Sequence, residues 1–436
     1  MNNVSGKMPV KADKVLLKGG RILDPAIQMD DVTDILVVDG TIQHIGSSGD
    51  ASFDGLQIDC QRKLIVPGLM DMHVHLREPG KEDAETIASG CAAAMAGGFT
   101  AVCCMPNTNP VIDDRSHVEF IKERSEGFLV DVHPFGAVTK GQQGEELTEM
   151  GDMIEAGAVG FSDDGYPVRN AVILRRALEY AKMFGHPVID HCEDLSLSEG
   201  GVMNEGFVST VLGMRGIPSI SEDVHVARDI LVAEYTGGPL HIAHVSTQGS
   251  VRLIREAKTR GVKISAETCP HYLVMIDEAV RSFDTNTKMK PPLRTEEDRQ
   301  ALLEGLKDGT IDVIASDHAP HTIEYKQTEY DAAAFGILGL ETALGLLMTH
   351  IVGKDVLNIG QLIEKVAIHP RHILNLPENR IEQGRQANLS IIDPELSWTV
   401  DKRKNVSKSK NTPFDGWELK GRGVGVLNNG QIYLLP

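Results

Sequence analysis

The sequence predicts an α/β protein: a (β/α)8 TIM-like barrel with a small β-sandwich domain formed from both chain termini. Short apolar segments alternate with helical stretches eight times through the middle of the chain, a pattern typical of a parallel sheet covered by helices. Further β-rich segments, separated by Gly, Asp and Asn turns, occur at both ends. An open doubly wound sheet is the main alternative, but no GxGxxG motif follows the early strands, and eight similar units favour closure.

Residues 1–65 and 385–436 are expected to form the small β domain together. The N-terminal part contains the segments "VLLKGGRILD", "DILVVDGTIQHIG" and "LQIDCQRKLIVPG", and the C-terminal part contains "ANLSIIDP", "GVGVLNNG" and "QIYLLP". Because both parts are rich in short β segments and flank a middle of different texture, we interpret them as two halves of one domain.

Residues 66–384 are expected to form the barrel. Its strand candidates are, in order, "IVPGLMDMHVHL", "GFTAVCCMPNT", "DVHPFGAVT", "AGAVGFSDDG", "HPVIDHCED", "PLHIAHVST", "VKISAETCPHYL" and "DVIASDHAPH". Amphipathic stretches such as "AETIASGCAAAMAG", "AVILRRALEYAKMFG" and "SVRLIREAKTRG" lie between several of them. Nearly every strand ends in His, Asp, Asn or Arg, and barrels of this kind build their active sites at the carboxyl ends of the strands.

Composition narrows the possible partners. The chain has 62 acidic and 43 basic residues, a formal net charge of -19, which argues against nucleic acid or an anionic membrane as a partner. No stretch approaches the roughly 20 apolar residues of a membrane span, and no signal peptide is evident. The six cysteines show no CxxC pair and indicate reduced thiols. We therefore expect a cytoplasmic protein that acts on a small molecule; an anionic substrate would need a local cluster of cations.

A pair of histidines in "DMHVHLREPG" gives the first sign of a metal site. A strand directs alternate side chains to one face, so His73 and His75 are expected to point the same way. The other strand ends then supply Asp164, His191, His244 and Asp317. A lone histidine is more often structural than a ligand. Four histidines and two aspartates in one barrel mouth, however, would bury unpaired charge unless a cation neutralised them, and this donor set suits Zn²⁺ and similar ions.

The motifs "DMHVHLREPG", "MPNTNP", "FSDDG", "DHCED", "HVST", "ETCPHYL" and "SDHAPH" occur in this order along the chain. Together they resemble the amidohydrolase superfamily, and most closely the class I dihydroorotases, across essentially the whole chain. The resemblance implies the reversible cyclisation of N-carbamoyl-L-aspartate to L-dihydroorotate in de novo pyrimidine (UMP) biosynthesis. It also implies two divalent metal ions per subunit, with Zn²⁺ favoured, although Co and Mn can share such ligands.

The resemblance assigns the metal ligands position by position. It gives His73 and His75 to the first metal, His191 and His244 to the second, and Asp164 to the position that bridges both.

The bridging position also helps to separate subfamilies. The neighbouring Asp163 is an alternative to Asp164, but the interval to the next histidine favours Asp164. Hydantoinases, allantoinases and some other dihydroorotases use a carboxylated lysine here, and no lysine occurs between Lys140 and Lys182. The sequence therefore favours the class I dihydroorotase pattern.

Asp317 matches the family's catalytic aspartate, which also contacts the first metal. A bound metal can lower the pKa of its water from about 15.7 to about 7. A carboxylate beside that water is placed to take its proton and deliver it to the leaving nitrogen. Ring closure consumes a carboxylate and takes up a proton, so we expect it to be favoured at lower pH.

A second group of residues matches the family's substrate contacts, and its members are His75, Arg77, Asn107, Lys290, His321, Phe335 and Gly336. Arg77 can pair with a carboxylate through two hydrogen bonds, but it could instead form a structural ion pair. Asn107 in "PNTNP" could be a turn residue. The stretch "HTIEYKQTEYDAAA" lacks an obvious secondary structure and is either a mobile lid or an inert loop.

Lys290 departs from the family pattern. Class I dihydroorotases typically read "KMNPPLR" where this chain reads "KMKPPLR", so a lysine replaces an asparagine that contacts substrate. The lysine could contact the substrate as a point charge or turn away to solvent.

Other interpretations of the chain stay open. It could be another cyclic amidohydrolase, such as an allantoinase or hydantoinase, or a non-catalytic scaffold for aspartate carbamoyltransferase. Arg77 and the missing lysine argue against the first, and the complete set of ligand positions argues against the second. The family resemblance implies a homodimer and a possible association with aspartate carbamoyltransferase. His271 and His318 are interpreted as structural, and the basic run 401–410 as a solvated loop.

Overall fold

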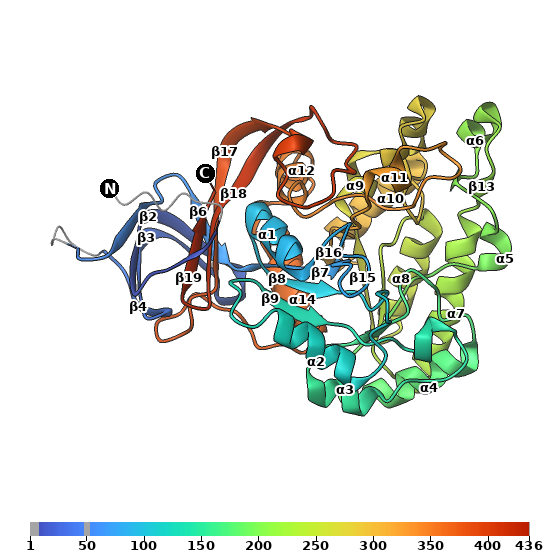
Figure 1. Ribbon diagram of the computed structural model, residues 1–436, viewed down its shortest axis with the longest axis horizontal. Helices are drawn as coiled ribbons and strands as arrows, with labels where there is room; N and C mark the ends of the chain where they lie inside the picture. Colours follow the sequence, from blue (N-terminus) through green and yellow to red (C-terminus); the bar gives the residue numbers. More distant parts are fainter. Residues whose placement is uncertain (1–7, 48–52, 436) are drawn as a thin grey trace.

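The computed structural model describes residues 8–47 and 53–435. Figure 1 shows a sheet that carries both ends of the chain on one side, and a barrel surrounded by helices on the other.

Eight parallel strands form the barrel. They are β7 (Leu69–Val74), β8 (Phe99–Cys104), β9 (Asp131–Pro134), β10 (Phe161–Ser162), β11 (Val188–Asp190), β14 (Leu240–Ile242), β15 (Ile264–Thr268) and β16 (Val313–Ile314). Hydrogen bonds join β7, β8 and β9 in one run. They join β10, β11, β14, β15 and β16 in a second run. Parallel bridges from Gly136 to Phe161 and from His318 to Val74 join these runs at both ends. The barrel is therefore closed, and each of the eight predicted strands is confirmed.

Helices follow most of the strands around the outside of the barrel. The longer ones are α1 (Ile87–Gly97), α2 (Arg115–Arg124), α3 (Met150–Ala156), α4 (Ala171–Lys182), α7 (Ile220–Thr236), α8 (Gln248–Thr259) and α10 (Glu296–Lys307). The shorter ones are α5 (Leu195–Ser198), α6 (Phe207–Leu212), α9 (Pro270–Val274), α11 (Ile323–Lys326), α12 (Ala343–Leu347), α13 (Ile359–Ile363) and α14 (His369–Ile373). A small ribbon of β12 (Met203–Asn204) and β13 (Gly216–Ile217) lies outside the barrel sheet. The three predicted helical stretches correspond to α1, α4 and α8.

Local sequence sets the ends of α1. The Thr86 side chain accepts a hydrogen bond from the Ser89 amide, and the Ser89 hydroxyl accepts one from the Thr86 amide. This reciprocal capping satisfies amide groups that have no partner inside the helix. At the other end Gly98 adopts φ 90°, a left-handed conformation that glycine adopts without strain.

Within the described residues, strands from both chain ends form one sheet of nine. They are β1 (Val10–Lys11), β2 (Lys14–Asp24), β3 (Met29–Val38), β4 (Thr41–Ile45), β5 (Leu56–Asp59), β6 (Leu64–Pro67), β17 (Leu389–Thr399), β18 (Glu418–Asn428) and β19 (Gln431–Leu434). Strand β17 lies between β18 and β6, so the C-terminal strands continue the N-terminal ones. A separate hydrophobic cluster that includes Leu17, Ile35, Leu389 and Ile432 packs within this sheet. The two chain ends therefore share one sheet, which is consistent with the predicted β domain.

The barrel contacts this sheet through glycines. A Cβ atom placed on Gly423 of β18 would lie 2.7 Å from the Cα of Gly98 and 3.0 Å from the carbonyl oxygen of Gly97. Backbone atoms already fill that space, so the two domains can approach this closely only if the facing positions lack a side chain.

The described residues contain no helix that is both long and apolar enough to cross a bilayer. All six cysteines are buried as free thiols, as the absence of a CxxC pair predicted.

Candidate metal centre and substrate site

Six buried side chains meet at the carboxyl ends of the barrel strands. His73 lies within β7, and the others follow their strands within three residues: His75, Asp164, His191, His244 and Asp317. These are the six ligand positions predicted from the sequence, and the closed barrel brings all of them together.

Asp164 lies between two pairs of histidines. Its Oδ2 is 3.5 Å from the Nε2 atoms of both His73 and His75. Its Oδ1 is 3.3 Å from His191 Nδ1 and 3.1 Å from His244 Nε2. Each carboxylate oxygen thus faces a different pair, which is the arrangement that a carboxylate bridging two cations requires.

Asp317 completes the first of the two groups. Its Oδ1 lies 3.2 Å from His75 Nε2 and 3.6 Å from His73 Nε2. Asp163, the alternative for the bridging position, points elsewhere. Its carboxylate accepts hydrogen bonds from the amide of Val138 and from the amide and hydroxyl of Thr139. The geometry therefore favours Asp164 over Asp163 as the member of the group.

The spacing of these atoms fits a divalent cation. Ligands held about 2.1 Å from a tetrahedral ion lie about 3.4 Å from one another, and the separations above range from 3.1 to 3.6 Å. His73 Nε2 is fully buried and has no hydrogen-bond partner within the described residues. Because buried polar atoms rarely stay unpaired, this nitrogen is available as a ligand.

Charge at the centre favours the ionised carboxylate. Burial raises the pKa of Asp164, but the charge of His73 and the hydrogen bonds of His191 and His244 outweigh it and hold that pKa well below its ordinary value. The carboxylate is thus kept in the form that binds a cation.

Two outer carboxylates were missed by the sequence interpretation. Glu267 of β15 places Oε1 2.5 Å from His73 Nδ1 and Oε2 3.3 Å from His241 Nε2. Glu193 places Oε2 3.3 Å from His191 Nε2. Each lies within a quoted motif, "ETCPHYL" or "DHCED". A glutamate inside an apolar strand is rarely fully buried without a partner, and that signal alone would have drawn attention to Glu267.

Asn107, His321 and Arg77, three of the predicted substrate residues, lie close to the first group or to one another. Asn107 Oδ1 lies 2.9 Å from His75 Nδ1, so the Asn107 side chain contacts a predicted ligand. His321 donates from Nε2 to the carbonyl oxygen of Phe335 over 2.7 Å, and Arg77 Nη2 lies 3.4 Å from that nitrogen.

Arg77 is buried and keeps most of its donors free. Its Nε–H donates to the carbonyl oxygen of Pro320 over 3.0 Å, and within the described part of the chain it forms no ion pair with a carboxylate. The structural ion pair that the sequence left open for Arg77 is therefore not observed within the described residues.

The backbone φ is 64° at Arg77, 48° at Asp317 and 34° at His244, and such strained conformations concentrate at functional sites.

Gly336 and Lys290 complete the set. Gly336 has φ 123°, and a Cβ there would lie 2.7 Å from the Cβ of Ala319, so the close backbone approach needs glycine. The Lys290 side chain does not extend fully into solvent. It forms an ion pair in which Nζ lies 2.9 Å from Glu193 Oε2. The same Nζ lies 5.6 Å from the centre of the Phe335 ring.

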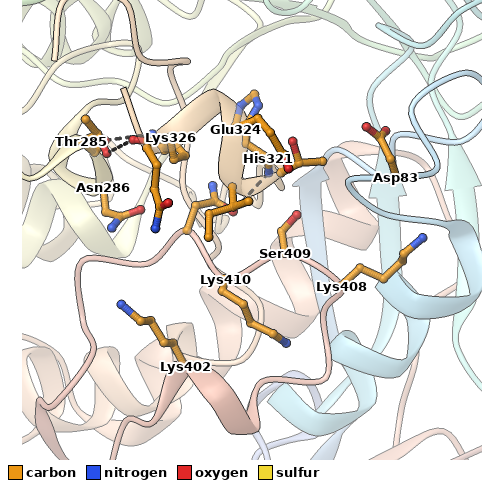
Figure 2. A pocket seen from close by; sticks show the side chains of 14 residues that line it. Asp83, Thr285, Asn286, His321, Glu324, Lys326, Lys402, Lys408, Ser409 and Lys410 are labelled. Carbon is orange, nitrogen blue, oxygen red and sulfur yellow. Dashed lines mark hydrogen bonds between the residues drawn. The ribbon is translucent and has the colours of Figure 1, made fainter. Parts of the chain in front are cut away.

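A cavity of about 640 Å³ opens beside His321. Figure 2 shows its lining, which includes Lys402, Lys408 and Lys410 from the basic run that the sequence interpretation took for a solvated loop. Asn411, which sequence reasoning missed, donates to the carbonyl oxygens of Ala319 and Gly336.

The predicted lid, residues 321–334, is not free of secondary structure. It contains the short helix α11, whose Lys326 donates to the carbonyl oxygens of Thr285, Lys288 and Ala334. His318, expected to face away from the mouth, accepts hydrogen bonds at Nδ1 from the amides of Gly339 and Leu340.

Comparison with known proteins gives a consistent result. A family model described as dihydro-orotase-like matches residues 62–250. A dihydroorotase of Pelotomaculum thermopropionicum is 54% identical over 97% of this chain and 98% of its own. A dihydroorotase of Syntrophus aciditrophicus is 51% identical over 96% and 99%.

Solved structures with the same fold include an L-hydantoinase (dihydropyrimidinase) from Arthrobacter aurescens, with TM-score 0.86, 25% identity and coverage of 97% of this chain and 96% of that one. A dihydropyrimidinase from Brevibacillus agri has TM-score 0.83, 22% identity and coverage of 97% and 95%.

Proposed function

This chain belongs to the dihydroorotase family, and from that membership we infer that it catalyses the reversible cyclisation of N-carbamoyl-L-aspartate to L-dihydroorotate in pyrimidine biosynthesis. It is thus a hydrolase that acts on a cyclic amide. Relatives named dihydroorotase match nearly its whole length at 54% and 51% identity. The hydantoinases share its fold at 25% identity or less, and the chain has no lysine near the position where those enzymes use one. A hydantoinase or allantoinase activity is therefore not favoured.

The observation that carries the mechanism is the position of Asp164 between two histidine pairs. We propose that His73, His75 and Asp317 hold a first divalent ion, that His191 and His244 hold a second, and that Asp164 contacts both. Zn²⁺ fits this nitrogen and oxygen donor set. When bound, such ions supply an activated water and polarise the scissile carbonyl. The filled ligand set also argues against a purely scaffolding role.

Asp317 is proposed as the general acid and base. Burial raises the pKa of this carboxyl, but the hydrogen bond with His75 and the charge of the neighbouring histidines bring it below its ordinary value. The Asp317 carboxylate is therefore ionised and can take a proton from the attacking water. It then delivers this proton to the leaving ring nitrogen. In the direction of ring closure the same carboxylate takes the proton from the attacking nitrogen.

Arg77 is proposed to bind the substrate carboxylate, with His321 and Asn107 beside it. Pro320 uses the Nε–H of the guanidinium, and no carboxylate of the described chain occupies its terminal N–H groups. Two parallel N–H groups match the two oxygens of a carboxylate. Gly336 and Phe335 would offer backbone groups to the ring, and Lys290 would stand at the side of the mouth.

We propose several further properties. The family resemblance implies a homodimeric state and a possible association with aspartate carbamoyltransferase, and the use of cysteine indicates a cytoplasmic location. The domain boundaries 1–65, 66–384 and 385–436, and a sandwich arrangement of the terminal sheet, stay predictions as well.

The test is a paired assay with two nearly isosteric variants. Ring opening of dihydroorotate is followed by ultraviolet absorbance, with hydantoin and allantoin as controls, and bound metal is counted by elemental analysis. We expect turnover of dihydroorotate alone and about two ions per chain. Asp164→Asn should lose metal and activity, whereas Asp163→Asn, one residue away, should keep both. Two bound ions without dihydroorotate turnover would refute the substrate, and equal losses in the two variants would refute the bridge.

A further inference from the structure

Three side chains from two separate segments form a polar chain beside the proposed second metal position. Lys290 Nζ lies 2.9 Å from Glu193 Oε2. The same oxygen lies 3.3 Å from Nε2 of His191. On the opposite side of the ring, His191 Nδ1 lies 3.3 Å from Asp164 Oδ1 and 2.9 Å from His244 Nε2. One nitrogen of this imidazole therefore faces the metal position, and the other faces a carboxylate that a lysine holds.

This ion pair is buried on the glutamate side and partly exposed on the lysine side. The Glu193 side chain is 6% exposed and the Lys290 side chain 28%. Phe335 lies beside the ammonium, 5.6 Å from Nζ to the ring centre. Among the described residues, Lys290 is the only lysine or arginine in an ion pair with Glu193, whose other ion-pair partner is His191. Charge pairs shielded from solvent are screened less than surface pairs, so Lys290 has a strong hold on the orientation of the carboxylate.

We propose that Lys290 is a positioning residue of the metal centre, which acts through Glu193 to fix the ring of His191. Held from one side by the ammonium, Glu193 accepts the Nε2–H of His191. That hydrogen bond leaves the lone pair on Nδ1. This nitrogen faces Asp164 and His244, at the proposed second metal position. An outer partner of this kind sets both the tautomer and the orientation of a ligating imidazole. The inference rests on the proposed metal site and does not depend on the identity of the substrate.

The proposed role of residue 290 requires a cation. The resemblance leads one to expect an asparagine here. An asparagine side chain has no charge, and it is too short to reach the Glu193 carboxylate as the lysine does. Without Lys290 the Glu193 carboxylate would lose the one lysine or arginine that pairs with it in the described chain, and it would be held less firmly against His191. The departure from the family motif is therefore explained as part of a lysine–glutamate–histidine unit.

The experiment measures metal retention in the absence of substrate. Metal-free wild type, Lys290→Asn, Lys290→Arg, Glu193→Gln and the double variant Lys290→Asn/Glu193→Gln are titrated with Co²⁺ and followed by visible absorption. Each is then challenged with a chelator, and bound metal is counted. We expect Lys290→Asn to weaken binding of one of the two ions about 10- to 100-fold, the range typical of lost outer partners. Lys290→Arg should restore it, and the double variant should be no worse than Glu193→Gln, because the two residues act as one unit.

Lys288→Met is the matched control. This lysine also lies over Phe335, 4.5 Å from the ring centre, but it donates to the carbonyl oxygen of Asp331 and has no link to Glu193 within the described residues. Its metal binding should equal that of the wild type. Unchanged metal binding in Lys290→Asn, with a raised KM for dihydroorotate, would overturn the proposal in favour of a direct substrate contact. Additive losses in the double variant would overturn it as well. A wild type that binds two ions but does not turn over dihydroorotate would refute the proposed function and leave this inference standing.

Discussion

Replacing Arg77 by lysine separates charge from geometry at the proposed carboxylate site. The lysine keeps a positive charge and the same left-handed backbone strain, since both residues carry a Cβ at φ 64°. It loses the planar pair of N–H groups, because an ammonium acts as a point charge. The variant therefore removes one of two hydrogen bonds to the substrate while the backbone keeps its conformation.

The size of the effect follows from the contacts of the guanidinium. Nε–H is occupied by Pro320, so the terminal N–H groups are the ones available to substrate. One hydrogen bond to a charged group contributes about 1.5 to 3 kcal/mol. At about 1.4 kcal/mol for each factor of ten, KM for dihydroorotate should rise about 10- to 150-fold. The interaction is present in both ground and transition states, so kcat should change little.

Steady-state ring opening, followed by loss of ultraviolet absorbance over a wide range of dihydroorotate concentrations, gives both constants. Metal content and thermal unfolding of the variant serve as controls for an intact site. A KM within about twofold of the wild type would show that Arg77 does not form the two-bonded carboxylate contact. A fall in kcat at constant KM would instead place Arg77 in the chemical step.

Three other changes test separate parts of the structure. Glu267→Gln keeps an acceptor for the Nδ1–H of His73 but removes the charge, and we expect metal affinity to fall about tenfold in a chelator competition. Burial, with the charges of Arg77 and Lys326, lowers the pKa of His321 to about 3, so below pH 6.5 the unfolded chain binds a proton that the folded chain refuses. The free energy of unfolding should therefore fall with falling pH between about 6.5 and 5, and His321→Asn should remove about 1.4 kcal/mol per pH unit of that slope in urea titrations. Gly423→Ala would press a Cβ against the backbone of Gly98, 2.7 Å away, and should lower the free energy of unfolding by about 1 to 3 kcal/mol.

Each of these has a contrary outcome. Equal chelator resistance in Glu267→Gln and wild type would show that the carboxylate charge does not support the ligand. Parallel pH slopes for His321→Asn and wild type would place the imidazole in a solvated environment. A Cβ added at Gly206 would meet its nearest neighbour, the side chain of Asn204, only at 3.5 Å, so Gly206→Ala is the reference for Gly423→Ala. Equal stability of these two alanine variants would contradict the close packing of the domains.

The barrel could be predicted from the sequence because the sequence signals that indicate it are local. Strand periodicity, helix amphipathicity and polar residues at strand ends are each visible within about ten residues, and the rule that barrel sites lie at the carboxyl ends of strands joins them. The grouping of His73 with Asp317 follows from that rule once the barrel closes. The β domain could be inferred in the same way, from similar texture at both ends.

The remaining features depend on side chains that meet only after folding. Nothing in "KMKPPLR" indicates that Lys290 would find Glu193, because the two lie on different loops and neither loop has a periodic pattern. Asn411 is similar: it follows an apparently solvated basic run, yet it bonds to the backbone of Ala319. Sequence reasoning also took the stretch around Lys326 for a loop, since a helix as short as α11 leaves little periodicity to detect.

The pairing of β6 with β17 joins a strand that is synthesised early to one that is synthesised late. Leu389 lies opposite Pro67 in the sheet, 322 residues later in the chain. At about 5 to 20 residues per second, the ribosome needs about 15 to 65 seconds to cover that distance. Throughout this interval one edge of β6, a wholly apolar strand, has unpaired backbone groups of the kind that join to neighbouring chains. All eight barrel strands emerge before β17 covers this edge, so slow translation near the end of the message would prolong the period in which nascent chains on one polysome can pair with each other.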